Sequence, residues 1–243
     1  RLCHASGSYE QTPSKNIVRE FVDNVVSSEA QYVLNVIVVD GRISMAQAQI
    51  RKYTMESFIE EVNEVFKTTE DPHVQAKTVS EHLKKLLAMP GWLEEKLELE
   101  EEGGFGRFSL HLDEGSGHPG NGWWLMASVQ KPGQDNLPHD HGATWVVYGV
   151  YEGTIRQRKW RWAFPGEGVD KAQIVEHGQF VQENGSVAYF MPGEIHDTLN
   201  VKEEGRSLVV RLESQKLDRV TRFQYNPEDG SMRMMDHTDP ANQ

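Results

Sequence analysis

Three histidines have the spacing of a metal-binding cluster. His139 and His141 are two residues apart, so in an extended segment both imidazoles point to the same face and can bind one ion. His196 ends the run 191–196, whose proline and glycine favour a tight turn that can bring its ring to the other two. Three neutral nitrogen ligands at about 2.0–2.2 Å leave open positions on Fe(II), Zn(II) or Ni(II). The spacing therefore favours a catalytic site over a closed structural one.

These histidines fall in a region whose pattern is typical of an antiparallel barrel or sandwich. From about Phe105 onward, short β-rich runs are separated by Gly, Pro, Asn and Asp at intervals of roughly ten residues. The expected strands are 123–130, 144–151, 154–162, 187–191 and 207–212. We therefore expect a metal-binding barrel over 105–225.

The preceding region has helical periodicity. Apolar residues recur at three- and four-residue steps from Met55 to Phe66, which places a hydrophobic stripe on one helix face. Thr78 with Glu81 three residues later forms a capping box, so a second helix is expected to begin there and to end before Pro90-Gly91.

The ends of the chain are less sharply patterned. The segment 17–26 also has helical spacing, whereas 36–39 fits either a strand or a buried helix end. The last residues are polar and rich in Met, Asp and Pro. We expect a helical region over 1–104 packed on the barrel and a tail over 226–243.

Composition excludes several classes of protein. Of 243 residues, 37% are hydrophobic and 26% charged, and no apolar run approaches the ~20 residues of a membrane span, which argues against a membrane protein. The net charge of −12 argues against a nucleic-acid partner and favours a small-molecule ligand.

The single cysteine, Cys3, cannot form an internal disulfide, so the cytoplasm is the default location. The start of the chain has no leader-like pattern, although a processed leader would leave no trace.

Two longer motifs around the histidines resemble those of the cupin superfamily. In the first, Gly133 precedes the His-x-His pair by five residues and Gly153 closes a later turn, but Val146 fills the slot of the usual acidic ligand. In the second, Gly185, Gly193, His196 and Asn200 have the spacing of the motif's glycines, histidine and asparagine, and Pro192 lies one place later than the usual proline. This resemblance implies a mainly β fold, the cupin double-stranded β-helix (jelly-roll barrel), with an N-terminal helical flank.

The missing carboxylate narrows the resemblance to three-His cupins of the thiol dioxygenase type. The run 186–200 is similar to the corresponding segment of cysteine dioxygenase and mercaptopropionate dioxygenase. The resemblance implies Fe(II) on His139, His141 and His196, with Zn or Ni able to occupy the site in a purified sample. The implied activity is an Fe(II)-dependent dioxygenase that adds O₂ to a small carboxylated thiol and forms a sulfinate. Cupins are often dimers, so a homodimer is one expectation.

The sequence departs from those enzymes at their outer-shell Ser-x-His-x-Tyr run. At the same distance after His196, this chain has Val209, Arg211 and Glu213 instead. In addition, no cysteine lies near Val146 to form the thioether crosslink found in some members. The resemblance therefore implies a divergent branch, whose substrate can differ from both cysteine and mercaptopropionate.

Arg211 is the first candidate for a clamp on a substrate carboxylate, since a guanidinium can donate two parallel hydrogen bonds. An ion pair with Glu213 is the structural alternative. Arg211 and Tyr189 are the candidate catalytic residues, and the candidate substrate-binding residues are Arg211, Arg158, Trp145, Tyr148 and His111, with Arg107, Arg156 and Trp124 as rivals.

Two other functions remain open. A three-His cupin can cleave a carbon–carbon bond of a diketone or aromatic substrate, and a cupin can bind a ligand or metal without catalysis.

Overall fold

The computed structural model describes residues 51–97, 105–115, 122–163 and 173–235, together with three short strands nearer the N-terminus. The chain divides into two compact units, Arg1–Tyr53 and Thr54–Gln243. In the first, β1 (Tyr32–Val33) pairs with β4 (Arg51–Lys52), and β2 (Val38–Val39) pairs with β3 (Arg42–Ile43). The ambiguous segment 36–39 thus ends in a strand, and the helix expected over 17–26 lies outside the described residues.

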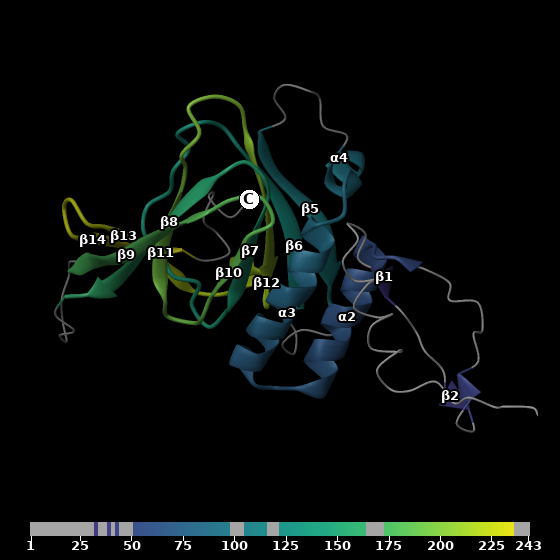
Figure 1. Ribbon diagram of the computed structural model, residues 1–243. Coiled ribbons are helices and arrows are strands. Elements are labelled where there is room, and N and C mark those ends of the chain that lie inside the picture. Colours follow the sequence, from purple (N-terminus) through teal and green to yellow (C-terminus); the bar gives the residue numbers. More distant parts are fainter. Residues whose placement is uncertain are drawn as a thin grey trace, which may run out of the picture. The chain divides into compact units, whose positions relative to one another are not determined.

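The second unit is built around two antiparallel sheets (Figure 1). The larger has the order β10-β7-β12-β6-β5 and the smaller the order β11-β8-β9. The strands are β5 (Gly106–Asp113), β6 (Trp123–Gln130), β7 (Val146–Glu152), β8 (Ile155–Trp162), β9 (Ile174–Gln182), β10 (Val187–Phe190), β11 (Ile195–Asn200) and β12 (Ser207–Glu213). All five strands expected from the β-rich runs and turn residues are confirmed within two residues at each end.

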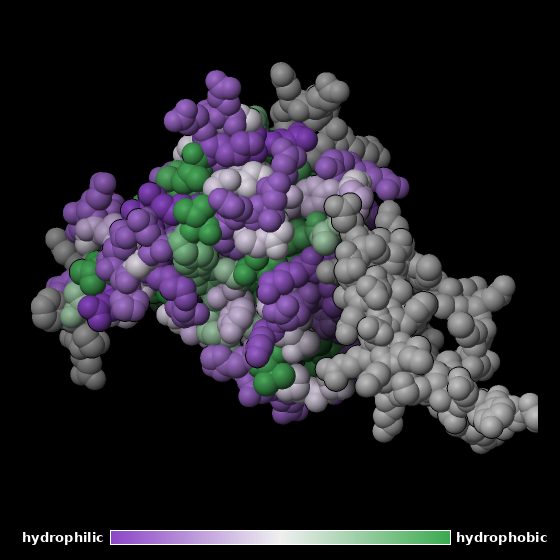
Figure 2. Space-filling model, viewed as in Figure 1, coloured by the Kyte–Doolittle hydropathy of each residue, from purple (hydrophilic) through white to green (hydrophobic). Residues whose placement is uncertain are grey.

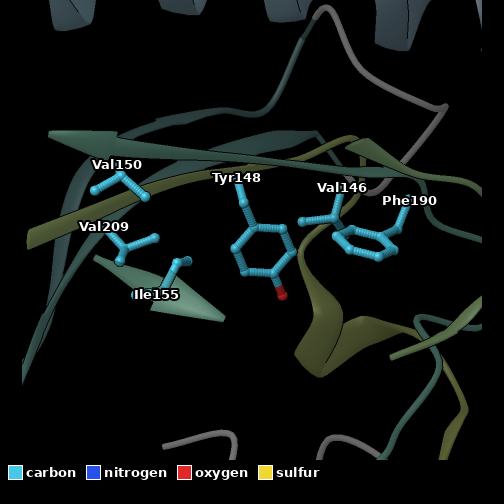
Figure 3. Packing of buried hydrophobic residues seen from close by; sticks show 6 residues of the cluster. All are labelled: Val146, Tyr148, Val150, Ile155, Phe190 and Val209. Carbon is cyan, nitrogen blue, oxygen red and sulfur yellow. The ribbon is translucent and has the colours of Figure 1, made fainter. Parts of the chain in front are cut away.

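Side chains of β7 alternate between two buried environments. Val146, Tyr148 and Val150 belong to the cluster inside the barrel, and Figure 3 shows their side chains gathered with those of neighbouring strands. On the other face, a Cβ added to Gly149 would lie 2.6 Å from Leu87 of α3, so a helix covers this side closely. Because both faces are buried, β7 is a nearly continuous apolar run rather than an alternating one.

Within the described residues, three helices precede the barrel strands: α2 (Met55–Thr68), α3 (Pro72–Leu87) and α4 (Trp92–Leu97). The side-chain oxygen of Thr54 accepts a hydrogen bond from Ser57 N at 3.2 Å and caps α2. The predicted stripe forms the buried face of this helix, where Phe58 and Val62 are fully buried. Among the described helices, none is long and apolar enough to span a membrane.

Helix α3 begins six residues earlier than predicted. Asp71 is the N-cap, because its Oδ1 accepts hydrogen bonds from His73 N at 2.9 Å and Val74 N at 3.3 Å. Pro72 at the first helical position fits this start, since its missing N–H needs no partner there. Thr78 therefore lies inside the helix, and the capping box read at that residue is wrong.

A C-terminal hairpin follows the barrel after the short 3₁₀ helix Leu217–Arg219. Strand β13 (Arg222–Asn226) pairs with β14 (Ser231–Met235). The segment expected as a tail from residue 226 thus contains an ordered strand. The face in Figure 2 is largely hydrophilic, with apolar side chains in small separate patches.

Candidate metal centre

The three predicted histidines lie together in the barrel. One ring nitrogen each of His139, His141 and His196 lies within 4.8 Å of the other two. His139 is 5% exposed and the other two are fully buried. The backbones of His139 and His196 exchange two hydrogen bonds, at 2.9 and 3.0 Å, which join the segment that carries His139 to β11. Gly193, with φ of +80°, makes the turn that leads His196 into β11, as its position before the histidine predicted.

A chain of hydrogen bonds fixes the tautomer of His196. Gln182 Nε2 donates to the backbone carbonyl of Tyr148 at 3.3 Å, so its Oε1 accepts from Gln157 Nε2 at 3.0 Å. The Oε1 of Gln157 therefore faces Nδ1 of His196, at 2.9 Å. Because an amide oxygen only accepts, Nδ1 carries the proton and Nε2 keeps a free lone pair.

His139 is oriented in the same way by a backbone carbonyl. Its Nδ1 lies 3.0 Å from the carbonyl oxygen of Leu137, which can only accept, so its Nε2 also keeps a lone pair. Nε2 of His141 lies 3.2 Å from Nε2 of His196. The buried Nδ1 of His141 has no hydrogen-bond partner among the described residues.

All three imidazoles are neutral at ordinary pH. Burial lowers the pKa of His139 to about 3. The pKa values of His141 and His196 also lie well below the usual range, because burial and then the neighbouring rings disfavour the charged form. Neutral imidazole is the form that binds a metal ion.

The distances fit a divalent transition-metal ion. Two nitrogens that are each about 2.1 Å from one ion, at right or tetrahedral angles, lie about 3.0–3.4 Å apart. The Nε2 atoms of His141 and His196 have that separation, 3.2 Å. Imidazole nitrogens suit Fe, Zn, Ni and Cu, so His139, His141 and His196 are the residues that would hold such an ion.

The slot of the usual acidic ligand is apolar. Val146 is fully buried in the interior cluster with Tyr148 and Phe190 (Figure 3). Among the described residues, no Asp, Glu or Cys joins the group of three histidines. The cluster therefore offers three neutral ligands and adds no negative charge of its own.

Asp140, between two of the histidines, faces away from them. Its carboxylate accepts hydrogen bonds from Gly142 N at 2.9 Å, Phe223 N at 3.2 Å and the hydroxyl of Tyr225 at 2.5 Å. Asp140 is 6% exposed, so these bonds compensate a buried charge. The residue anchors the C-terminal hairpin to the loop that carries His139 and His141.

Tyr148 and Arg211, both predicted site residues, lie beside the cluster. The hydroxyl of Tyr148 is 3.4 Å from Nε2 of His141, and its ring centroid is 5.2 Å from that of His196. Arg211 Nη1 is 3.5 Å from the same hydroxyl. Arg211 also forms an ion pair with the fully buried Glu213, as expected for a structural role of this arginine. Burial alone would lower the pKa of Arg211, but Glu213 and Tyr148 together raise it above its usual value.

Arg158 and Tyr189, also predicted as site residues, face away from the cluster. Arg158 Nε donates to both oxygens of Asp197, at 2.9 and 3.0 Å, and alternates with the inward-facing Gln157. Tyr189 is 36% exposed, because it alternates with the buried Phe190 on β10. The structure does not bring either residue to the cluster.

Trp145 and His111 lie on the helical side of the barrel. Trp145 Nε1 donates to Gln75 of α3 at 3.2 Å, and its ring stacks on Phe66 of α2 with centroids 5.8 Å apart. The ring of His111 lies 4.8 Å from that of Trp123, whose Nε1 donates to Asn63 at 2.7 Å. Packing against helices rather than substrate explains these large side chains.

A cavity of about 650 Å³ reaches the cluster at His139. Arg107, Arg211 and Arg222 line it, and Trp124 contributes an aromatic wall. A smaller cavity of about 120 Å³ shares Arg107 and Arg211 and extends to Tyr148. Arg107 and Trp124, rivals in the sequence interpretation, are thus brought to the site, whereas Arg156 is not among the lining residues.

Sequence reasoning missed Gln157 and Arg222. Gln157 reaches His196 only because β8 pairs with β11, where it lies opposite Thr198. Arg222 belongs to a strand that the polar C-terminal pattern did not suggest. The one sequence signal for Gln157 is its place two residues after Ile155, which in a strand puts both side chains on the same face.

Comparison with known proteins found similar solved structures but no related sequence. No protein-family model matches the chain, and no curated protein matches its sequence. Similar solved structures include the Cnp3 cupin domain of Schizosaccharomyces pombe, with 10% identity, a TM-score of 0.35 and coverage of 49% of this chain and 66% of that one. A conserved protein with a double-stranded β-helix domain from Klebsiella pneumoniae has 15% identity, a TM-score of 0.33 and coverage of 59% and 88%. An oxalate oxidase has 18% identity, a TM-score of 0.33 and coverage of 49% and 57%, so the chain spans little more than half of that enzyme.

The predicted mainly β fold of antiparallel sheets is confirmed, and a cupin domain and a double-stranded β-helix domain are among the solved structures found to be similar. Fold and site together define a barrel of antiparallel strands with a buried three-histidine cluster that has the geometry of a metal site. The chemistry of the site must therefore be inferred from the chain's own side chains.

Proposed function

We propose that this protein is an Fe(II)-dependent dioxygenase that oxidises a small carboxylated thiol to a sulfinate. The observation that carries the proposal is the neutral three-histidine cluster, which opens at His139 into a cavity lined by arginines. In the overall reaction, a thiol R–SH and O₂ give R–SO₂H. Both oxygen atoms enter the product, so no further reductant is required.

The charge of the cluster supports a thiol as the reacting group. An iron(II) ion held there would supply the redox chemistry with O₂ and would favour the thiolate form of a bound thiol, as metal binding does generally. Because Val146 replaces a carboxylate, the protein adds no anion that competes with the substrate for the ion's positive charge.

The arginines support a carboxylated substrate. Arg107, Arg211 and Arg222 come from three different strands and line the same cavity. A guanidinium binds a carboxylate through two parallel hydrogen bonds, which fixes orientation as well as position. The arginines would hold the acid group while the sulfur lies at the histidines.

Tyr148 and Arg211 would take the place of the outer-shell run that this sequence lacks. The hydroxyl of Tyr148 lies between the ring of His141 and the guanidinium of Arg211. It can donate a hydrogen bond to a substrate atom at the cluster while it accepts one from Arg211. Glu213 holds Arg211 in position from the side.

The test is anaerobic reconstitution with Fe(II), followed by oxygen-electrode measurements with a panel of mercapto-acids and β-diketones. Thiol-dependent O₂ uptake with one sulfinate formed per O₂ is expected, and His196→Ala should abolish it. His177→Ala is the matched control, because His177 is exposed on β9 and belongs to no metal-binding group. Product identification by mass spectrometry should show two added oxygen atoms.

Two outcomes would overturn the proposal. Uptake with a β-diketone and none with any thiol would point to carbon–carbon bond cleavage. An iron-loaded protein that consumes no O₂ with either class, yet binds an acid tightly, would be a binding protein.

A further inference from the structure

We infer that the cavity beside His139 selects a substrate with two carboxylate groups, and that Arg222 binds the second carboxylate. The inference deepens the proposed function and rests on it for the identity of the reacting thiol. Recognition of the two carboxylates depends only on the cavity itself.

The basic residues of the cavity surround His139 from separate parts of the fold. Arg107 lies on β5, Arg211 on β12 and Arg222 on β13. All three line the same 650 Å³ space as His139. Burial and then the charge of Arg211 lower the pKa of Arg222, so the guanidiniums are close enough to repel each other. A bound polyanion would relieve this repulsion.

The charge of the described lining exceeds what one carboxylate needs. The cavity has four basic side chains, Arg107, Arg211, Lys216 and Arg222. It has three acidic ones, Asp135, Glu213 and Asp218, which leaves a net charge of +1. A divalent ion on neutral histidines would add two more positive charges. A thiolate with two carboxylates carries three negative charges and matches this total, whereas a thiolate with one carboxylate leaves one positive charge in a partly buried site.

The arginines approach the cavity from two parts of the fold. Arg107 and Arg211 lie on strands of the larger sheet and also line the smaller cavity, whereas Arg222 lies on the C-terminal hairpin and is not among the residues that line the smaller one. Arg107 lies at the exposed rim of the cavity, and Arg222 is 6% exposed in its wall. One acid group can therefore bind at the Arg107 and Arg211 side, and a second at Arg222.

The position of Arg222 is fixed relative to the histidines. Its neighbour Phe223 receives a hydrogen bond from Asp140 N at its carbonyl, at 3.0 Å, and donates from its own N–H to Asp140 Oδ1 at 3.2 Å. Asp140 lies between His139 and His141 in the chain. A Cβ on Gly142 would lie 2.2 Å from the carbonyl oxygen of Thr221, so the hairpin lies directly against this loop. The hairpin thus holds a guanidinium at a set distance from the metal-binding cluster, which is what discrimination between acids of different length requires.

The first experiment measures binding without a thiol. Calorimetry of the full chain loaded with Zn(II) would compare succinate with propionate, which differ by one carboxylate. Succinate should bind at least about tenfold more tightly, the usual effect of one added charge-assisted contact. Arg222→Gln should reduce the ratio to within about threefold and leave propionate affinity almost unchanged. The matched control is Arg219→Gln, because Arg219 pairs with Glu114 on the surface and does not line the cavity.

Equal affinity of the wild-type protein for succinate and propionate would overturn the inference without any variant. A preference that survives Arg222→Gln would overturn the role of Arg222. If Arg222→Gln does not fold, as judged by circular dichroism, Arg222→Lys replaces it. Lysine keeps the charge but not the planar pair of donors, so the preference should fall severalfold, and an unchanged preference would count against Arg222.

A second experiment separates this inference from the proposed function. Mercaptosuccinate and 3-mercaptopropionate also differ by one carboxylate, and kcat/KM for O₂ uptake by the iron-loaded protein should favour mercaptosuccinate by about tenfold or more. No uptake with either thiol, together with a succinate preference, would reject the oxygenase but keep the two-carboxylate site. Equal kcat/KM for both thiols and no succinate preference would keep the oxygenase and reject the site.

Discussion

The side-chain oxygen of Gln157 accepts a hydrogen bond from Nδ1 of His196 at 2.9 Å. The same oxygen accepts from the hydroxyl of Thr198 at 2.9 Å, and the amide nitrogen donates to Gln182. Every polar atom of the Gln157 amide group is thus used to hold one imidazole in the tautomer that presents Nε2 to the cluster.

Replacement of Gln157 by Leu should weaken metal binding by about 10–100-fold, the usual effect of losing a partner that orients a metal-binding histidine. Competition with a chelator for Zn(II) or Co(II) measures the affinity directly. Gln179→Leu is the control, because Gln179 is exposed on the neighbouring strand β9. An unchanged affinity in Gln157→Leu would show that packing alone orients His196.

A carboxylate at position 146 should make stability depend on metal. Val146→Glu places a charged group at a fully buried position, which should lower the Tm of the metal-free protein. Added Zn(II) should raise the Tm of this variant more than that of the wild type, since the new carboxylate stands in the slot of a fourth ligand. Thermal unfolding with and without the ion measures both effects.

Val147→Glu is the matched control for that substitution. Val147 is equally buried, but it follows Val146 on β7 and faces the opposite side of the sheet. Its replacement should destabilise the protein without extra rescue by Zn(II). Equal rescue of the two variants would contradict the assignment of position 146 to the metal side of the strand.

Loss of the Tyr225 hydroxyl should loosen the C-terminal hairpin. That hydroxyl donates to the buried carboxylate of Asp140 at 2.5 Å, and burial together with Asp140 raises the pKa of Tyr225 above its usual value. Tyr225→Phe should reduce the free energy of unfolding by about 1–3 kcal/mol, the range for a hydrogen bond to a charged group. Urea denaturation measures the loss, and Tyr189→Phe on the outer face should be nearly neutral. A loss of the same size in both variants would argue against a special role for the Asp140 contact.

The metal-free protein should lose stability as the pH falls from about 6.5 toward 3. The folded pKa values of His139, His141 and His196 lie below the unfolded value of 6.5, so unfolding takes up protons in this window. The stabilisation is fully present above pH 6.5 and is lost as the pH approaches the folded pKa values. Each histidine contributes a slope of about 1.4 kcal/mol per pH unit.

His139→Gln should therefore flatten this pH dependence by about 1.4 kcal/mol per unit between roughly pH 4 and 5.5. Denaturant titrations of the metal-free protein across that range measure the slope. His177→Gln, at an exposed position, should leave it unchanged. A slope in His139→Gln equal to that of the wild type would show that His139 is already protonated in the folded state.

The sequence alone predicted the three histidines and five of the eight strands in the two sheets, whereas β5, β9 and β11 were not among the expected strands. Runs of β-forming residues bounded by turn residues mark β6, β7, β8, β10 and β12. Strand β14 was not predicted, because four of its five residues are exposed and only Met235 is buried. The start of α3 was misplaced because Thr78 and Asp71 both fit a cap in sequence, and only the structure shows which side chain accepts the backbone N–H groups.

The direction of a side chain was the harder problem. Tyr189 and Tyr148 look alike in sequence, yet Tyr148 faces the cluster and Tyr189 faces outward, because strand register decides which face each residue occupies. Gln157 and Arg222 meet the site through pairings that join segments far apart in the chain. His139 and His141 could be predicted from their local spacing, and His196 from the turn residues that precede it, because a metal site demands particular residue types in particular local conformations. The Gln157 amide that fixes the tautomer of His196, and the cavity lined by arginines, could not be predicted. They depend on contacts that exist only after the two sheets and the C-terminal hairpin have come together.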